Sequence, residues 1–113
     1  MKLRVVNEWD ALHTVVVGTA ASMGPIPSVA EAYDPKSREH IRSNTYPSEA
    51  DCQRELDALE ALLQGQGVHV LRPKVLNDVN QIFARDVGAV VDDRFVVTRV
   101  ISDRTEEWDG VAP

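Results

Sequence analysis

"NQIFARDVGAVVDDRFVV" (residues 80–97) sets two adjacent charges, Arg85 and Asp86, at the entrance of an apolar run. The run predicts a β-hairpin, because Asp92 and Asp93 separate two segments rich in β-branched residues. A buried strand tolerates charges at its entrance only where something binds them. Arg85 and Asp86 are therefore expected either to form local surface salt bridges or to belong to a binding site.

Upstream of this stretch, the sequence predicts a strand, a helix and a second strand. "LRVV" (residues 3–6) and "LHTVVVGT" (residues 12–19) are typical of strands, and the three valines of the second suggest burial on both faces. "VHVLRP" (residues 68–73) predicts a further short strand, closed by Pro73. The order strand, helix, strand indicates an α/β fold with a crossover onto one sheet.

The clearest helix is predicted within residues 46–67. Ser48 is a suitable N-cap, and Glu49 and Asp51 favour the positive end of the helix dipole. The residues that recur at helical period predict one buried stripe; they are Cys52, Leu56, Leu59, Leu62 and Leu63.

Two polar segments flank these elements. Residues 21–40 are rich in Gly, Pro and Ser and predict a long loop, with a short helical turn after Pro35. Long loops in compact domains often serve as lids or binding loops. The polar segment of residues 102–113 could open another helix.

Length and composition fit a single domain, residues 1–113, and restrict its partners. Lys and Arg total 12 against 18 Asp and Glu, a net charge of −6, which argues against nucleic acid and anionic lipid as ligands. A lone cysteine, Cys52, forms no intramolecular disulfide and fits a reducing compartment. The sequence shows neither a signal peptide nor a membrane span, so we expect a cytoplasmic protein.

Candidate nucleophiles and metal ligands are few. Cys52 falls on the helical stripe and is expected to be a core residue. His13, His40 and His69 are far apart and share no metal-ligand spacing, so no metal site is predicted.

A cation site is the more specific interpretation of residues 80–86. Asp86 could accept paired N–H groups from a guanidinium, and the ring of Phe83 could stack on the planar cation. Asn80 could donate a hydrogen bond to a substrate carboxylate. Together these three residues would suit an arginine-like ligand.

Three stretches, in order, resemble the guanidino-group-modifying (pentein) superfamily. "NQIFARD" resembles the Asn-x-x-Phe-Thr-Arg-Asp segment of arginine deiminases and the Arg-Asp segment of amidinotransferases. "VNEWDALHTVVVG" resembles the start of amidinotransferases, and residues 33–63 are similar to bacterial amidinotransferase-like proteins. Ala84 stands where deiminases often have Thr.

This resemblance implies a pentein α/β propeller built from ββαβ-type units. Residues 1–113 would be its N-terminal portion, the first unit and the start of the second. The resemblance also implies a Cys thiolate that attacks the guanidinium carbon and a His that acts as acid and base, with neither metal nor organic cofactor. Asp86 falls on the family's guanidinium-binding Asp, Phe83 on its aromatic residue and Asn80 on its carboxylate-contacting Asn, whereas Arg85 is expected to be structural.

The family's catalytic His and Cys would lie beyond these 113 residues, so we expect the chain alone to be inactive and to be a truncated part of an enzyme. Exposed edges of a partial propeller would favour self-association. Three alternatives stay open: an arginine deiminase-type hydrolase fragment, a non-catalytic pentein-like binding or assembly module, and an α/β domain whose Arg85 and Asp86 form only a surface pair.

Overall fold

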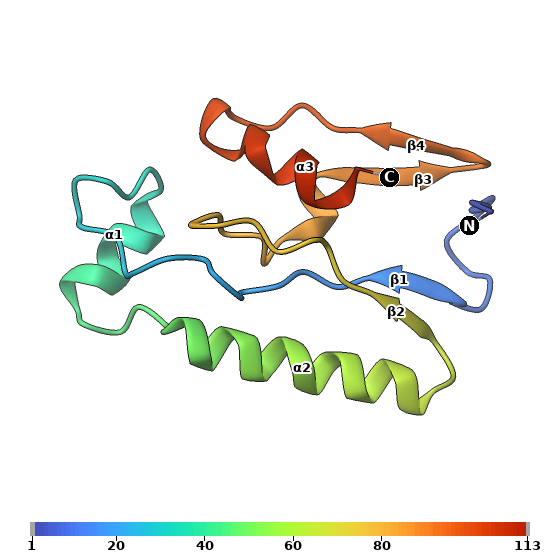
Figure 1. Ribbon diagram of the computed structural model, residues 1–113, viewed down its shortest axis with the longest axis horizontal. Helices are drawn as coiled ribbons and strands as arrows, with labels where there is room; N and C mark the ends of the chain where they lie inside the picture. Colours follow the sequence, from blue (N-terminus) through green and yellow to red (C-terminus); the bar gives the residue numbers. More distant parts are fainter. Residues whose placement is uncertain (1, 113) are drawn as a thin grey trace.

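The computed structural model describes residues 2–112, which form two separate two-stranded sheets with helices around them (Figure 1). Strand β1 (Thr14–Val16) pairs in parallel with β2 (His69–Leu71), and β3 (Gly88–Val91) pairs antiparallel with β4 (Arg94–Val97). The predicted α/β mixture and the hairpin are confirmed. The pentein propeller stays a prediction, since nothing in the described residues closes into one.

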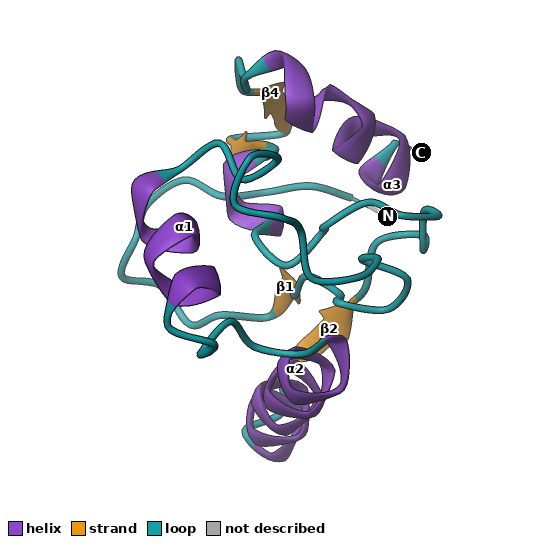
Figure 2. Cartoon of the chain, turned by 90° about the vertical axis from the view of Figure 1, so that its left-hand side faces the viewer, coloured by secondary structure: helices purple, strands orange, loops and turns teal. Residues whose placement is uncertain are grey.

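Three α-helices and two 3₁₀-helices make up the rest of the regular structure within residues 2–112. They are α1 (Pro35–Arg42), α2 (Glu49–Gly65), η1 (Ala84–Asp86), η2 (Ser102–Glu107) and α3 (Trp108–Val111). Helix α2 lies along one side of the β1–β2 pair, and the β3–β4 hairpin lies on the other (Figures 1 and 2). Because β1 and β2 pair in parallel and α2 lies between them in the sequence, the predicted crossover is confirmed. Within residues 2–112 no helix is both long enough and apolar enough to span a bilayer.

Helix α2 begins and docks through polar contacts. The Ser48 hydroxyl accepts a hydrogen bond from the Asp51 N–H at 3.1 Å, which confirms the predicted cap. The guanidinium of Arg72, the residue that follows β2, binds Asp57 at 3.0 Å and Glu60 at 2.8 Å. Ion pairs thus fix the helix to the strand it covers.

The hydrophobic predictions are only partly confirmed. Along the α2 stripe Leu56 and Leu63 are half-buried, but Leu59 and Leu62 are exposed. Val17 is buried whereas Val16 is 44% exposed, so the prediction that this strand is buried on both faces was wrong. The reason is that α2 packs on one side of the β1–β2 pair, whereas the β3–β4 hairpin on the other side does not pack closely against β1 (Figure 2).

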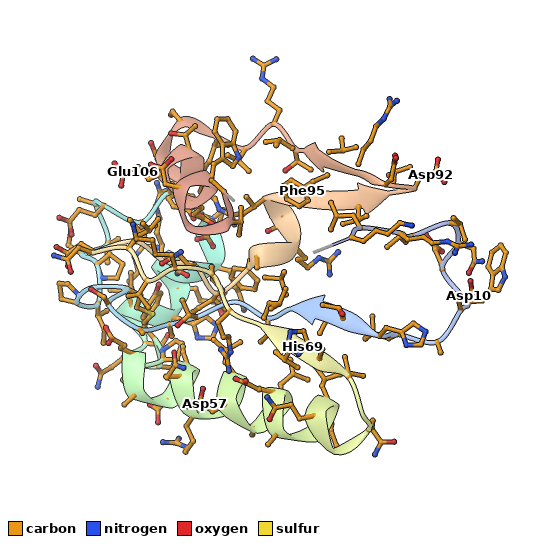
Figure 3. All side chains as sticks on the ribbon, turned by 45° about the vertical axis from the view of Figure 1, so that its right-hand side comes forward. Asp10, Asp57, His69, Asp92, Phe95 and Glu106 are labelled. Carbon is orange, nitrogen blue, oxygen red and sulfur yellow. The ribbon has the colours of Figure 1, made fainter. Side chains whose placement is uncertain are left out.

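The N-terminal segment forms a turn and not the predicted strand. Only Val5 pairs, through one antiparallel bridge to Asp92 at the hairpin turn. The Asn7 side-chain oxygen then accepts hydrogen bonds from the N–H groups of Trp9 and Asp10, which leaves the Trp9 ring 84% exposed. Asp10 and Asp92 lie at the same end of the molecule, away from Glu106 (Figure 3).

The side-chain amide of Gln81 joins several segments at the centre of the fold. Gln81 is 2% exposed; its oxygen accepts from the Leu76 N–H at 2.8 Å, and its nitrogen donates to the Lys74 carbonyl at 2.9 Å. Its own carbonyl accepts from the Thr19 N–H at 3.1 Å. A Cβ at Gly110 would lie 2.2 Å from the Gln81 amide nitrogen, so only glycine lets α3 approach this closely.

The apolar core around this amide is small. Its buried hydrophobic residues are Val17, Ala20, Ala32, Val68 and Val87. Since little apolar surface is removed from water, buried hydrogen bonds carry an unusual share of the specificity of the fold.

Replacing Gln81 by Ala should destabilise the chain by about 2 kcal/mol or more, because the Leu76 N–H and the Lys74 carbonyl would lose a buried partner. Urea unfolding followed by circular dichroism measures the loss. Gln64→Ala, which removes an exposed amide on α2, is the control and should change little. Equal losses in the two variants would contradict the central role of Gln81.

Candidate functional site

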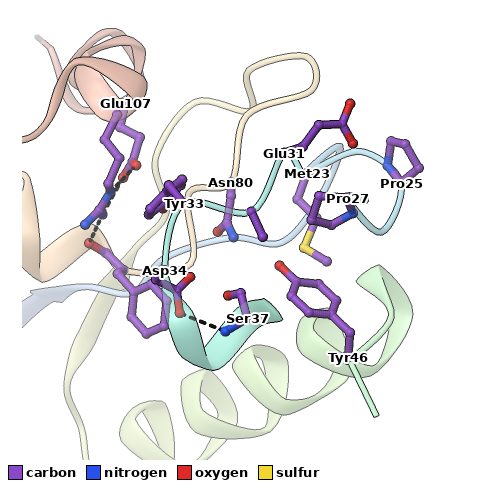
Figure 4. Close-up of a pocket in the computed structure, with 13 residues that line it drawn as sticks. Met23, Pro25, Pro27, Glu31, Tyr33, Asp34, Ser37, Tyr46, Asn80 and Glu107 are labelled. Carbon is purple, nitrogen blue, oxygen red and sulfur yellow. Dashed lines mark hydrogen bonds and ion pairs between the residues drawn. The ribbon is translucent and has the colours of Figure 1, made fainter. Parts of the chain in front are cut away.

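An open pocket of about 260 Å³ brings together segments that are far apart in the sequence (Figure 4). The Gly/Pro-rich loop and α1 form one wall, and the loop before η1 together with η2 forms the other. Its lining residues include three carboxylates and three aromatic rings: Glu31, Asp34, Glu107, Tyr33, Tyr46 and Phe83. The part of the predicted loop that precedes α1, residues 21–34, thus contributes a wall of the pocket.

Two of the three predicted ligand-binding residues line this pocket. Asn80 lies between Tyr33 and Met23 in the view of Figure 4. Its side-chain oxygen accepts a hydrogen bond from the Ile82 N–H at 3.1 Å, which holds the turn that leads into η1. Phe83 is 55% exposed and immediately precedes η1, so its ring is accessible to a ligand.

Asp86 lies beside the pocket and not at a strand end. The Asp86 N–H donates to the Phe83 carbonyl and the Val87 N–H to the Ala84 carbonyl, so the chain closes a 3₁₀ turn before β3 begins at Gly88. The prediction of a strand-end carboxylate was wrong for this reason. The Asp86 side chain is 44% exposed and binds Arg104, which lines the pocket, at 2.9 Å.

The side chain of Arg85 is more exposed than that of Asp86 and is held less closely. Its side chain is 89% exposed, and its Nε lies 3.8 Å from the nearer oxygen of Asp86. Exposed pairs at this distance contribute little to stability. The local pair considered from the sequence therefore exists, but the stronger partner of Asp86 is a residue 18 positions downstream.

Arg104 and Glu107 are site residues that the sequence analysis did not single out. Glu107 is 4% exposed and accepts from Arg104 Nε at 2.6 Å and from Nη2 at 2.9 Å. The available signal was their spacing of three residues in a helix-forming segment, which places the two side chains on one face. Hydrogen bonding to Glu107, and then to Asp86, raises the pKa of Arg104 above its already high ordinary value.

Asp34 determines the electrostatics of the wall formed by the Gly/Pro-rich loop and α1. Its side chain caps α1 by accepting from the Ser37 N–H at 2.8 Å, and hydrogen bonds from Ser37 lower the pKa of Asp34. Burial, followed by the negative charge of Asp34, raises the pKa of Tyr46. At neutral pH the pocket thus presents an ionised Asp34 beside a protonated phenol, an arrangement that attracts cations.

The remaining candidate nucleophiles lie elsewhere. Cys52 is half-buried on α2, and burial, then Glu55 and Asp51, raise the pKa of its thiol, so it lacks thiolate character. Pairing of β1 with β2 brings the backbones of His13 and His69 together, whereas His40 contacts Thr45. No group of three metal-ligating side chains forms in the part of the chain that the structure describes.

The chain is similar to part of an amidinotransferase. It is 40% identical over 76 residues to inosamine-phosphate amidinotransferase 1 of Streptomyces griseus. The match covers 59% of this chain but only 22% of that relative, so it supports a guanidino-modifying relationship at a coarse level. No family model matches the chain, and no solved structure matches it.

The capping contact of Asp34 should respond to acid. The pKa of Asp34 in the folded chain is lowered from its ordinary value of 3.8. The contact therefore stabilises α1 fully above that value and is lost as the pH falls through the lower folded-state pKa. An NMR titration of the Ser37 amide should therefore show a midpoint below 3.8. In Asp34→Asn the titration step should vanish, and a midpoint at or above 3.8 would contradict the assignment.

Proposed function

We propose that this chain is the guanidinium-binding N-terminal part of an amidinotransferase-like enzyme that acts on arginine or a related guanidino compound. Asp86 grips the guanidinium, Phe83 stacks on it, and Asn80 contacts the carboxylate of the substrate. In this proposal the Cys nucleophile and the His acid–base of the reaction come from outside these 113 residues. The chain itself supplies binding and orientation.

One observation carries this proposal: Asp86, the predicted guanidinium-binding carboxylate, already binds a guanidinium of the same chain, that of Arg104. Its nitrogens lie 2.9 Å from Asp86 and 2.6 Å from Glu107, distances typical of charge-assisted hydrogen bonds. Local geometry at η1 and η2 therefore suits a planar cation. The 40% identity to an amidinotransferase supports the same class of substrate.

Transfer of the amidino group to an amine is favoured over hydrolysis because the relative is named as an amidinotransferase. A deiminase-type hydrolase shares the guanidinium grip and differs in the acceptor, which is water. The difference would arise from residues that exclude or admit water around the covalent intermediate. Asp86, Phe83 and Asn80 would serve both reactions equally.

Removing the Asp86 carboxylate should weaken arginine binding about tenfold or more, since hydrogen bonds to charged groups contribute ~1.5–3 kcal/mol. Calorimetric titration of the chain with arginine tests this in the wild type and in Asp86→Ala. Asp93→Ala, an exposed carboxylate at the hairpin turn, is the matched control and should bind as the wild type does. Unchanged affinity in Asp86→Ala would remove Asp86 from the site.

A second candidate function, that of an assembly module, is favoured by a different observation. Large apolar side chains are exposed on the hairpin and near the N-terminus; they include Val6, Trp9, Leu12, Val91, Phe95, Val96 and Val97. Contiguous exposed apolar surface commonly marks an interface. This function requires neither Asp86 nor a bound guanidinium.

Light scattering coupled to size exclusion tests the assembly function. If the hairpin associates, the wild type should run at twice the 12.5 kDa of one chain or more, and Val96→Asp should shift the mass toward one chain. Val75→Asp, a similarly exposed valine on the loop after β2, is the control. A wild-type chain that stays monomeric at all concentrations would exclude the assembly function.

A further inference from the structure

Three side chains from η1 and η2 form a carboxylate–guanidinium–carboxylate cluster, which we call the Arg104 triad: Glu107, Arg104 and Asp86. Arg104 Nη1 lies 2.9 Å from Asp86 Oδ2, while its Nε and Nη2 lie 2.6 and 2.9 Å from the two oxygens of Glu107. The triad joins the start of the β3–β4 hairpin to the segment that follows it. Arg104 and Glu107 line the pocket, and Asp86 reaches it through its contact with Arg104.

The three members are exposed to very different degrees. The side chain of Glu107 is 4% exposed, that of Arg104 is 18% exposed and that of Asp86 is 44% exposed. If Arg104 left Glu107, a buried carboxylate would lose both of its charged donors, which is costly. Arg104 is therefore fixed by Glu107, and Asp86 is the member that faces solvent.

Asp86 keeps capacity for a second cation. Only its Oδ2 bonds to Arg104, and its Oδ1 lies 3.8 Å from Arg85 Nε, beyond hydrogen-bond distance. Two carboxylates and one guanidinium leave the triad with one net negative charge. Arg85 is a second cation near Asp86, but its side chain is 89% exposed and its charge is screened by solvent. An incoming guanidinium thus meets an oriented carboxylate whose Oδ1 lies beyond hydrogen-bond distance of Arg85.

We infer that Arg104 is a positioning residue, which holds the Asp86 carboxylate in one orientation so that its other oxygen can accept a substrate guanidinium. This inference rests on the proposed function, because it assigns Arg104 a role in the same site. The backbone reinforces the arrangement, since the Thr98 hydroxyl donates to the Asp86 carbonyl and Arg104 Nη2 lies 3.5 Å from the Phe83 carbonyl. A carboxylate fixed in advance binds its partner without losing rotamer freedom on binding.

The opposite role would be that of an internal competitor, with Arg104 occupying Asp86 and excluding the ligand. The two roles predict opposite results for Arg104→Met. Loss of a positioning residue weakens arginine binding, whereas loss of a competitor strengthens it.

A double-mutant cycle with arginine as the calorimetric probe tests the inference. Arg104→Met should weaken binding about fivefold to tenfold in the wild-type background and have no further effect in Asp86→Ala, because Arg104 acts through Asp86. Arg104→Lys preserves the charge facing Glu107 and therefore guards against unfolding. Its affinity for arginine should lie between that of the wild type and that of Arg104→Met. Arg54→Met, which removes an exposed pair on α2, is the control and should bind as the wild type does.

Tighter binding in Arg104→Met, or equal losses with and without Asp86, would overturn the inference. A ligand-independent measurement separates it from the proposed function: NMR couplings of Asp86 should report one side-chain rotamer in the wild type and averaged rotamers in both Arg104 variants. If the wild type fails to bind arginine, the proposed function fails while the couplings still decide the positioning role. A single Asp86 rotamer in the Arg104 variants would overturn that role.

Discussion

A single buried side-chain amide, that of Gln81, determines how the segment that follows β2 packs against α3. Its oxygen and nitrogen are both used by the chain that leaves β2, at Leu76 and Lys74. The same residue pairs through its backbone with Thr19, at the end of the segment that carries β1. Because Asn80 and Phe83 lie within two residues of Gln81, the hydrogen bonds of this amide fix their positions in the pocket.

The amide also positions η2, which forms part of one wall of the pocket. Gly110 packs against it, and the Gly110 carbonyl accepts from the Lys74 N–H at 2.8 Å. Residues 102–111 form η2 and α3, so this contact sets where Arg104 and Glu107 lie relative to η1. Polar groups thus do in this small fold what a large apolar core does in others: they define which segments are neighbours.

Much of the local structure was predictable from the sequence because its causes are local. The Ser48 cap and the Asp92–Asp93 turn depend on signals a few residues long, and the β1–β2 crossover follows from the order of three such elements; each was confirmed. Asp92 adopts a φ of 55°, a left-handed conformation that Asp tolerates in tight turns.

The site was less predictable because its decisive contacts join distant residues. Asn80 and Phe83 were found by residue type and line the pocket, but the partner of Asp86 is Arg104, brought near only by the hairpin between them. Burial of Gln81 and exposure of Val16 likewise depend on which faces are covered, which no local pattern encodes. The 3₁₀ turn at Asp86 arises from backbone bonds that the charge pattern did not reveal.

The two tryptophans of the chain make it its own optical reporter. Trp9 is held outward by the Asn7 turn and is 84% exposed, so its emission should be red and readily quenched by a soluble collider such as iodide. Trp108 opens α3, next to the Gly110–Gln81 contact, and its indole nitrogen is buried. Its emission should be blue and protected for as long as α3 stays docked, so one spectrum separates the exposed N-terminal turn from the docked helix α3.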